Sequence, residues 1–477
     1  MTGDTVASAD APVGLVLAAG LGKRMRSDLL KVLHPVGGRP MVIRVLAALR
    51  DAGLGRAVLI SGHQADALRS TIAAWAAAVD PMEVLWAHQA EQRGTGHAVA
   101  QGLAAVPRAG SVLVMAGDAP LVEPAELRSL WAQHAASGAA ATLLTARPPD
   151  PTGYGRILRD DAGRARAIVE ERDASPEQRR IGEVFTLVAC FDAAPLGRAL
   201  ARCAPANAQA EVYLTDVIAI FAADGLPVET RIAADADAVL GINDRRALAR
   251  AEARLRARTL ERLMDAGVTV LDPQTTYVDD DCTFEADTVL HPLTVVQGGC
   301  RVGPRCVLGP GAHLRTSLLA ADVRVWHSVV EGSRVGEGCR IGPFSHLRPG
   351  TELGAEVEVG NFAELKNARL GAGSKQHHHS YLGDAELGAR VNVGAGVITV
   401  NYDGARKHRT RVGDGAFLGC NANLVAPLEV GAEAFVAAGS TLTAAVPSGA
   451  LGIARARQVN KPGWTARRRT DPPAGPV

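Results

Sequence analysis

The chain has 477 residues, of which 51 are glycine and only 4% are aromatic. Its length predicts two to four domains of roughly 100–200 residues each, and its 47% hydrophobic and 21% charged residues exclude a disordered chain. Lys and Arg (51) balance Asp and Glu (50), so the net charge of +1 gives no bulk electrostatic reason to expect binding to nucleic acid or to a membrane.

The N-terminal segment and the cysteines bear on compartment. Residues 1–12 are small and polar, so we expect a disordered N-terminal tail and no signal peptide. No uncharged apolar run approaches the roughly 18 residues of a membrane span. The seven cysteines form no C-x-x-C pair and no zinc-type cluster, so we expect free thiols in a cytoplasmic protein.

The first half of the chain alternates two kinds of segment. Short β-branched runs at 13–19, 57–61 and 112–116 are typical of buried strands, whereas residues 40–50 and 124–134 have helical spacing. Strands that alternate with helices predict βαβ units. The expected fold is therefore an α/β, Rossmann-like domain with a mostly parallel sheet.

The second half repeats an aliphatic residue every six positions, with a short phase break and an interruption around 371–411. Period six fits neither a helix nor an alternating strand. It is typical of a hexapeptide β-helix, in which each aliphatic side chain points into a narrow prism. The three runs are Leu290, Val296, Val302, Leu308 and Leu314; Val323, Val329, Val335, Ile341, Leu347, Leu353, Val359 and Leu365; and Val412, Leu418, Leu424, Val430, Val436 and Leu442.

A charged helical segment joins the two halves, so we expect a linker helix over 244–267. The remaining divisions are a first domain over 13–243, a β-helix domain over 268–456 and a C-terminal tail over 457–477. Within that tail, the Pro and Gly content of 465–477 favours disorder.

Groups that suit phosphate chemistry collect in the first half. Residues 17–25 form a Gly-rich turn directly after a strand, which presents backbone N–H groups to a phosphate or a base. Lys31 follows, and residues 90–98 form a second Gly loop with a hydroxyl. Asp118 ends an apolar strand, where α/β sheets bind ligands and where a carboxylate suits Mg²⁺. A helix cap or a turn residue is the structural alternative for Asp118.

The second half holds three adjacent histidines within residues 375–384, and a second polar stretch at 401–411. Three consecutive residues cannot all point at one ion from an extended chain, so a metal tract is disfavoured. A neutral histidine can accept a proton near pH 7, which makes a general base possible. A plain surface loop is the alternative.

Several motifs together resemble one enzyme family. They are LAAGLGKRM, SDLLKVLH, QAEQRGTGH, GDAPL, DPTGYGRI, VEERDA and NAQAEVYLTD, followed by the hexapeptide repeat. Over residues 13–465 the chain resembles the bifunctional N-acetylglucosamine-1-phosphate uridyltransferase and glucosamine-1-phosphate acetyltransferase family. The resemblance implies a left-handed β-helix, a homotrimer formed through it, Mg²⁺ as cofactor, and acetyl-CoA, UTP and sugar phosphates as small-molecule partners.

For uridyl transfer, the resemblance implies that Arg24 and Lys31 face the phosphates and that Asp118 and Asn243 hold Mg²⁺. Cations neutralise the triphosphate while the sugar phosphate attacks in line, so no nucleophilic side chain is needed. The other implied contacts to UTP and to the UDP-sugar are Leu17, Ala18, Ala19, Gly20, Gln89, Gly94, Thr95, Gly117, Gly155 and Glu170.

For acetyl transfer, the resemblance implies that His378 is the general base and that Glu364 orients it or shares its proton. The amine of glucosamine 1-phosphate would attack the acetyl-CoA thioester directly. Arg348 and Lys366 would hold the sugar phosphate, since a dianion needs cations. The remaining implied contacts, completed between subunits of the trimer, are Tyr381, Asn392, Ala395, Asn401, Tyr402, Cys420, Ala438 and Arg455.

The chain departs from the family pattern at several positions. Phe185 stands where a sugar-binding Asn is expected, and Leu187 stands at a small-residue position two residues later. Our hypothesis is that uridyl transfer is weakened or its sugar preference altered; the alternative is that the pocket tolerates the change. Cys420 replaces an expected Ser and His379 an expected apolar residue. Leu30 and Lys23 are further departures, replacing a Pro and a Thr.

Two other functions fit parts of the pattern. One is a pyrophosphorylase for another sugar phosphate whose β-helix has a different role. The other is a trimeric β-helix, acting as a scaffold or an acetyltransferase, whose first domain binds nucleotide only for regulation.

Overall fold

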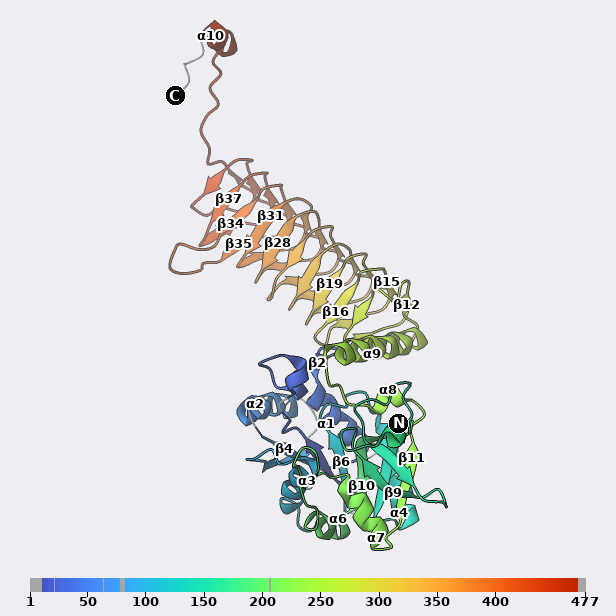
Figure 1. Cartoon of the computed structure of the whole chain (residues 1–477). Helices are drawn as coiled ribbons and strands as arrows, with labels where there is room; N and C mark the ends of the chain where they lie inside the picture. The colour runs from blue at the N-terminus through green and yellow to red at the C-terminus, as the bar shows by residue number, and fades with distance from the viewer. Residues whose placement is uncertain (1–10, 21, 63, 78–81, 206, 471–477) are drawn as a thin grey trace. The chain divides into compact units, whose positions relative to one another are not determined.

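The computed structural model describes residues 11–20, 22–62, 64–77, 82–205 and 207–470 (Figure 1). Most of the expected N-terminal tail lies outside these residues. The chain divides into two compact units, Met1–Leu255 and Arg256–Val477.

The first unit is built on a nine-stranded sheet with the path β11-β7-β10-β6-β1-β4-β5, extended by the hairpin β8–β9. Strands β6, β1, β4 and β5 run parallel, whereas β10 lies antiparallel between β6 and β7. The expected mostly parallel α/β sheet is thus confirmed. The strands are β1 (Val13–Leu17), β4 (Arg56–Ser61), β5 (Glu83–His88), β6 (Ser111–Ala116), β7 (Ala141–Ala146), β8 (Arg156–Arg159), β9 (Ala165–Val169), β10 (Val184–Asp192) and β11 (Val228–Ile232), with a separate hairpin of β2 (Pro35–Val36) and β3 (Arg39–Pro40).

Helices cover both faces of this sheet because neighbouring strand residues point to opposite sides. Leu15 and Val114 belong to one apolar cluster, while Val16 and Met115 belong to the other. The helices are α1 (Met41–Asp51), α2 (Ala65–Ala76), α3 (Thr95–Ala104), α4 (Pro124–Ser137), α5 (Pro176–Arg179), α6 (Ala193–Leu200), α7 (Asp216–Ala223) and α8 (Ala236–Val239), with short 3-10 turns at Lys23–Met25 and Lys31–Leu33.

The second unit is a parallel β-helix in which successive strands of the chain go in turn to three sheets (Figure 1). The first sheet contains β12 (Thr269–Val270), β15 (Val289–Leu290), β18 (Val307–Leu308), β21 (Arg324–Val325), β24 (Arg340–Ile341), β27 (Glu358–Val359), β30 (Lys375–Gln376), β33 (Asn392–Val393), β36 (Phe417–Leu418), β39 (Phe435–Val436) and β41 (Leu451–Gly452). The second contains β13 (Tyr277–Val278), β16 (Val295–Gln297), β19 (His313–Arg315), β22 (Val329–Glu331), β25 (His346–Leu347), β28 (Ala363–Lys366), β31 (Ser380–Gly383), β34 (Ile398–Val400), β37 (Asn423–Val425) and β40 (Thr441–Leu442). The third contains β14 (Thr283–Phe284), β17 (Arg301–Val302), β20 (Leu318–Leu319), β23 (Arg334–Val335), β26 (Glu352–Leu353), β29 (Arg369–Leu370), β32 (Ala385–Leu387), β35 (Thr410–Val412) and β38 (Leu428–Val430).

The period-six series forms the β-helix core, with one correction to its phase. Val329 is only partly buried, whereas Val325 and Val330 are fully buried and pair with Leu308 and Leu314 of the preceding coil. Val323 is also buried but precedes its strand. Some sides of these coils are five residues long, and a strict count of six therefore loses register.

The prediction that the hexapeptide repeat is interrupted over 371–411 is also mostly wrong. Coils continue through it as far as β34, and only residues 401–409 leave the helix as a loop. The pattern was hidden because Gln376 and Thr399 occupy inward positions that are elsewhere aliphatic, and both are buried.

Helix α9 (Arg245–Asp265) occupies the expected linker region. Its first half packs Ala251 and Leu255 into the apolar cluster of the first unit, while Leu260 and Leu263 belong to the β-helix core. A further helix, α10 (Trp464–Thr470), forms where the composition favoured disorder, because Ala and Arg are good helix formers between the flanking Gly and Pro residues.

All seven cysteines are free thiols, as expected. Among the described residues, no helix has both the length and the apolar character needed to cross a bilayer.

Candidate active sites

A cavity of about 410 Å³ opens at the carboxyl ends of β1 and β6 in the first unit. This is the edge at which α/β sheets bind ligands. The structure brings to its wall twelve residues expected there from the sequence: Leu17, Ala18, Ala19, Gly20, Lys31, Gln89, Gly94, Thr95, Asp118, Gly155, Glu170 and Asn243. Gly117 adjoins the wall, since its N–H donates to the Leu17 carbonyl (2.9 Å), and the exposed Arg24 reaches the wall through its bond to Asn243.

A charged cluster forms one part of this cavity. The Lys31 ammonium pairs with the Asp118 carboxylate, and both side chains are at most 15% exposed. Lys31 Nζ also donates to Asn243 Oδ1 (2.8 Å), and Arg24 Nη2 donates to the same oxygen (2.9 Å). Two cations are thus held at the mouth of a cavity, where they could meet the phosphates of a ligand.

Asp118 and Asn243 supply hard oxygen donors of the kind that Mg²⁺ prefers. The Gly241 backbone lies close to Asp118, since a Cβ placed on Gly241 would lie 2.7 Å from Asp118 Oδ1. One carboxylate and one amide oxygen do not make a closed cage. They fit an ion whose other ligands are phosphate oxygens and water, which is the usual arrangement for Mg²⁺ on a nucleotide. Among the described residues, no group of three or more His, Cys, Asp or Glu could hold a metal.

The Gly-rich loops frame another part of the cavity. Gln89 Nε2 donates to the Gly94 carbonyl (3.0 Å), and Gln92 Nε2 donates to the Ala19 carbonyl (2.6 Å). Gly94 has φ +103°, and a Cβ there would lie 2.5 Å from the Val212 carbonyl oxygen, so only glycine fits. Glycine at this position therefore lets the loop pack directly against the backbone of Val212.

Glu170 and Phe185 lie on the same cavity wall. Burial raises the pKa of Glu170, although a hydrogen bond from the Thr215 hydroxyl (3.1 Å) opposes that shift. Phe185 is 6% exposed, and its N–H donates to the Gly155 carbonyl (2.9 Å). Leu187 also lines the cavity and adopts φ +60° at a bulge of β10, a conformation that favours glycine. Both departures from the family pattern therefore face the cavity.

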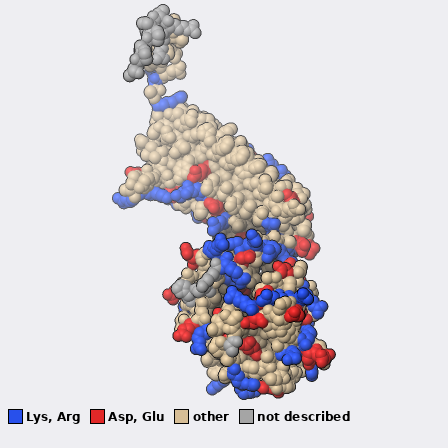
Figure 2. Space-filling view, in the orientation of Figure 1, with Lys and Arg blue, Asp and Glu red and all other residues tan. Residues whose placement is uncertain are grey.

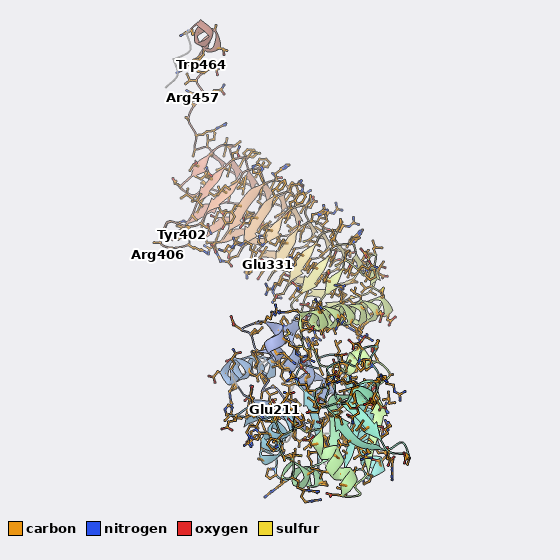
Figure 3. The ribbon with its side chains drawn as sticks, viewed as in Figure 1. Glu211, Glu331, Tyr402, Arg406, Arg457 and Trp464 are labelled. Atoms are coloured by element: carbon orange, nitrogen blue, oxygen red, sulfur yellow. The ribbon has the colours of Figure 1, made fainter. Side chains whose placement is uncertain are left out.

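Sequence reasoning missed several residues of the wall. Gln92, Tyr154 and Glu211 line the cavity, and all three stand inside motifs that were recognised. Glu211 is labelled in Figure 3. Burial raises the pKa of Tyr154, which favours its protonated phenol as a hydrogen-bond donor. Their position inside these motifs is the signal that could have identified them as residues of the site.

The β-helix carries its expected functional residues in two rows. The corner between the first and second sheets holds His378, Ala395, Cys420 and Ala438 in successive coils. Backbone hydrogen bonds tie these corners together: Gly396 to the His379 carbonyl, Asn421 to Ala395 and Gly439 to Cys420, at 2.7–2.8 Å. His378 is exposed and sits at the head of this row. At one strand spacing, roughly 5 Å per coil, the row can support an extended ligand. Arg455 and Asn392 lie at its border, with Arg455 Cδ near Gly439 and Asn392 paired with Phe417.

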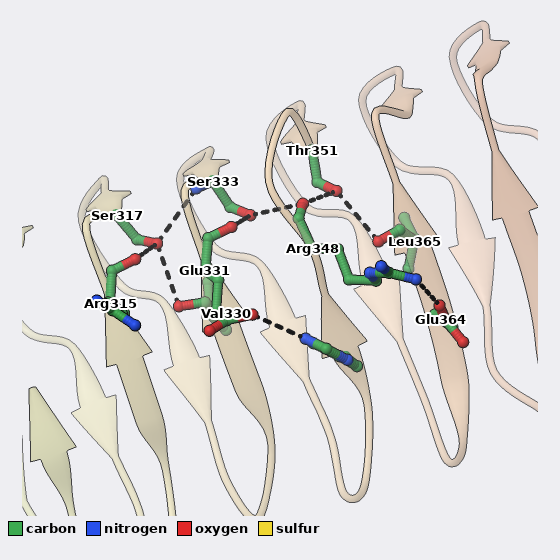
Figure 4. Close-up of polar contacts among 10 residues, drawn as sticks. Arg315, Ser317, Val330, Glu331, Ser333, Arg348, Thr351, Glu364 and Leu365 are labelled. Atoms are coloured by element: carbon green, nitrogen blue, oxygen red, sulfur yellow. Dashed lines mark hydrogen bonds and ion pairs between the residues drawn. The ribbon is translucent and has the colours of Figure 1, made fainter.

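The second row lies on the outward face of the second sheet. Arg348 Nη1 donates to Glu364 Oε1 (2.8 Å; Figure 4). Glu364 is in register with Tyr381 on the next coil. In the described part of the chain, no hydrogen bond joins Glu364 to His378, so its contact is with the cation and not with the expected base. The neighbouring Lys407 lowers the pKa of Lys366, as expected for two ammonium groups held close together.

The 401–409 loop completes this row. Asn401 Nδ2 donates to Asp384 Oδ2 (2.5 Å), and the Tyr402 hydroxyl donates to the Gly404 carbonyl (2.6 Å). Tyr402 and Arg406 project outward (Figure 3), and Lys and Arg gather around the loop (Figure 2). Because Tyr402 is 57% exposed, most of its ring is available to something outside this chain.

The fold and the two sites define a nucleotidyltransferase joined to a hexapeptide-repeat transferase. Residues 14–181 match the MobA-like NTP transferase domain, and residues 332–367 match the bacterial transferase hexapeptide family of six repeats. The second unit is accordingly a left-handed β-helix.

Whole-chain relatives narrow this class. The chain is 47% identical to the bifunctional protein GlmU of Brevibacillus brevis over 448 residues, 94% of this chain and 95% of that protein. It is 46% identical to the GlmU of Shouchella clausii and 47% identical to that of Heliobacterium modesticaldum, each over 95% of this chain and 98% of the relative. The chain belongs to the bifunctional GlmU family, and is an enzyme of UDP-N-acetylglucosamine synthesis with uridyltransferase and acetyltransferase activities.

Proposed function

We propose that the cavity of the first unit, with the Lys31–Asp118–Asn243 cluster, is where UTP reacts with N-acetylglucosamine 1-phosphate. The observation that carries this proposal is two cations, a carboxylate and an amide converging at the carboxyl edge of the sheet. Lys31 and Arg24 neutralise the triphosphate. The sugar phosphate oxygen attacks the α-phosphorus and pyrophosphate leaves, so the protein contributes positioning and charge.

Mg²⁺ belongs to this proposal. Asp118 and Asn243 are the residues that would hold the ion, and when bound it supplies charge neutralisation at the phosphates. Lys31 contacts both residues. It therefore keeps the two oxygen donors together, beside its own ammonium group.

We infer a direct acetyl transfer in the second unit, with His378 as the base. The amine nitrogen of glucosamine 1-phosphate attacks the thioester carbonyl carbon, a C–N bond forms and the C–S bond breaks. His378 accepts the amine proton and passes it to the departing sulfur, so that coenzyme A leaves as the thiol. Arg348 and Lys366 bind the sugar phosphate, and Glu364 fixes the Arg348 guanidinium by the 2.8 Å hydrogen bond. The corner row from Ala395 to Ala438 supports the coenzyme.

A homotrimer formed through the β-helix is part of the same proposal. The corner that carries His378 also carries an exposed ladder of rings in the preceding coils, His327, Phe344 and Phe362, with centroids 5.7 and 5.4 Å apart. Phe344 is 56% exposed and Phe362 is 63% exposed. A second copy of the chain would cover these rings and place its own groups beside His378. Substituting both phenylalanines by serine should yield monomers in sedimentation experiments.

The domain boundaries also remain our proposal: uridyl transfer by 13–243, acetyl transfer by 268–456, and helix α9 between them.

The two half-reactions can be assayed separately on the full-length protein. Acetyl transfer is followed by thiol release, and uridyl transfer by pyrophosphate release with Mg²⁺ present. His378→Ala should lower acetyl transfer by about a hundredfold or more and leave uridyl transfer unchanged. His379→Ala, its neighbour on the same corner, is the matched control and should change neither rate greatly. Equal losses in the two variants would contradict the assignment of the base.

A further inference from the structure

Helix α9 makes polar contacts with the segment that carries Lys31. Arg245 Nε donates to the Met25 carbonyl (3.2 Å), and Glu252 Oε2 accepts the Gly37 N–H (2.6 Å). These two contacts hold the segment on either side of Lys31. The segment therefore depends on the helix as well as on its own short turns.

The contact at Gly37 is unusually close. Gly37 has φ +55°, and a Cβ there would collide with the Leu255 side chain of α9 and lie 2.7 Å from Arg44 Nη2. The buried Arg44 guanidinium in turn donates to the Val36 carbonyl (2.5 Å) and to the Gly37 carbonyl (2.9 Å). The hairpin that follows Lys31 is thus pressed against α9 with no room for a side chain.

The same helix holds the segment that leads to Asn243. Arg254 forms ion pairs with Asp235 and with Asp237 (3.0 Å), which bracket the start of α8. Further along, Ile242 packs in one apolar cluster with Ala251 of α9, and its N–H donates to the Asp118 carbonyl (2.8 Å). The helix therefore fixes both the beginning and the end of this segment.

The two segments meet at one atom. Asn243 Oδ1 accepts hydrogen bonds from Lys31 and Arg24, which stand more than 200 residues away in sequence. We propose that Glu252 and Arg254 of α9 are positioning residues for uridyl transfer, because they set the spacing between the Lys31 segment and the Asn243 segment. This inference rests on the proposed role of the cavity. It makes α9 part of the frame of the uridyl site and more than a linker.

The test uses the full-length protein and both half-reactions. Glu252→Gln and Arg254→Gln should each raise the KM for UTP by about fivefold to tenfold, and raise the Mg²⁺ concentration needed for half-maximal rate, while acetyl transfer stays unchanged. Arg254→Lys keeps the charge and should recover part of the loss. Asp237→Asn removes one ion pair from the opposite side and should move the same two parameters in the same direction.

Matched controls come from the same helix. Arg246 and Glu261 are exposed on α9, so Arg246→Gln and Glu261→Gln should leave the KM for UTP unchanged. Unchanged KM values in the Glu252, Arg254 and Asp237 variants would overturn the proposal. So would a fall in kcat with no change in KM or Mg²⁺ requirement, or a parallel loss of acetyl transfer and thermal stability, because either would indicate general destabilisation. Absence of uridyl transfer in the unaltered protein would instead refute the proposed function of the cavity.

Discussion

Replacing Phe185 by asparagine tests whether the phenyl ring limits uridyl transfer. The ring is 6% exposed, lines the cavity and belongs to an apolar cluster with Ile157 and Ile168. An amide at this position could hydrogen-bond to a sugar hydroxyl or acetamido group, whereas a phenyl ring cannot. Such a bond is worth about 0.5–1.5 kcal/mol, and about 1.4 kcal/mol corresponds to a factor of ten.

We therefore expect Phe185→Asn to raise kcat/KM for N-acetylglucosamine 1-phosphate by about twofold to tenfold. The variant should also lose stability, by about 3–5 kcal/mol, because a buried ring is removed from the cluster. The assay is pyrophosphate release with N-acetylglucosamine 1-phosphate and glucose 1-phosphate side by side, and thermal unfolding measures the stability. Phe185→Leu is the control that keeps the position apolar. If both variants leave unchanged the ratio of kcat/KM for N-acetylglucosamine 1-phosphate to kcat/KM for glucose 1-phosphate, the reasoning about this wall is refuted.

Three further substitutions address the rest of the first site. Lys31→Met should lower uridyl transfer by about a hundredfold with acetyl transfer intact, since it removes a cation from the phosphates; a loss below about threefold would contradict that role. Gly94→Ala should destabilise the protein by about 1–3 kcal/mol, because φ +103° and the Val212 carbonyl both exclude a Cβ. Glu170 has a raised pKa because of burial, so its ionised form is disfavoured by folding. This cost is absent well below the ordinary carboxylate pKa and grows as pH rises through the folded pKa. Glu170→Gln should therefore raise the melting temperature at pH 8 more than at pH 4, and equal shifts would contradict the sign.

Much of the second unit could be predicted because its core repeats. One aliphatic residue per side of each coil is a local rule, and Leu290 and Leu365 obey it equally. The rule fails where the core itself changes chemistry. Gln376 and Thr399 make polar contacts inside the core, with Gln376 bonded to Ser380 and Thr399 to the Gly383 backbone, so hydrophobic periodicity could not find them.

The uridyl site could be predicted only in its parts. The Gly-rich turn and Asp118 can be recognised because each directly follows an apolar strand, which is a local property of the sequence. The bond between Lys31 and Asn243 spans 212 residues, and no spacing in the sequence foretells it. The same holds for the ion pairs of Arg254, whose helix has the charge pattern of an ordinary solvent-exposed connector. These contacts form only because tertiary packing brings distant segments of the chain together.

The buried Gln376 has a consequence for how the β-helix moves. Among the residues that the structure describes, its Oε1 finds no hydrogen-bond partner, and its side chain is fully buried. In a solenoid each coil touches only its two neighbours, so the cohesion of the stack is a chain of separate interfaces and the weakest one opens first. An interface with an unsatisfied amide oxygen costs less to separate than an aliphatic one. The proposed base His378 therefore stands on a coil whose contact with its neighbour costs less to open than a purely aliphatic one.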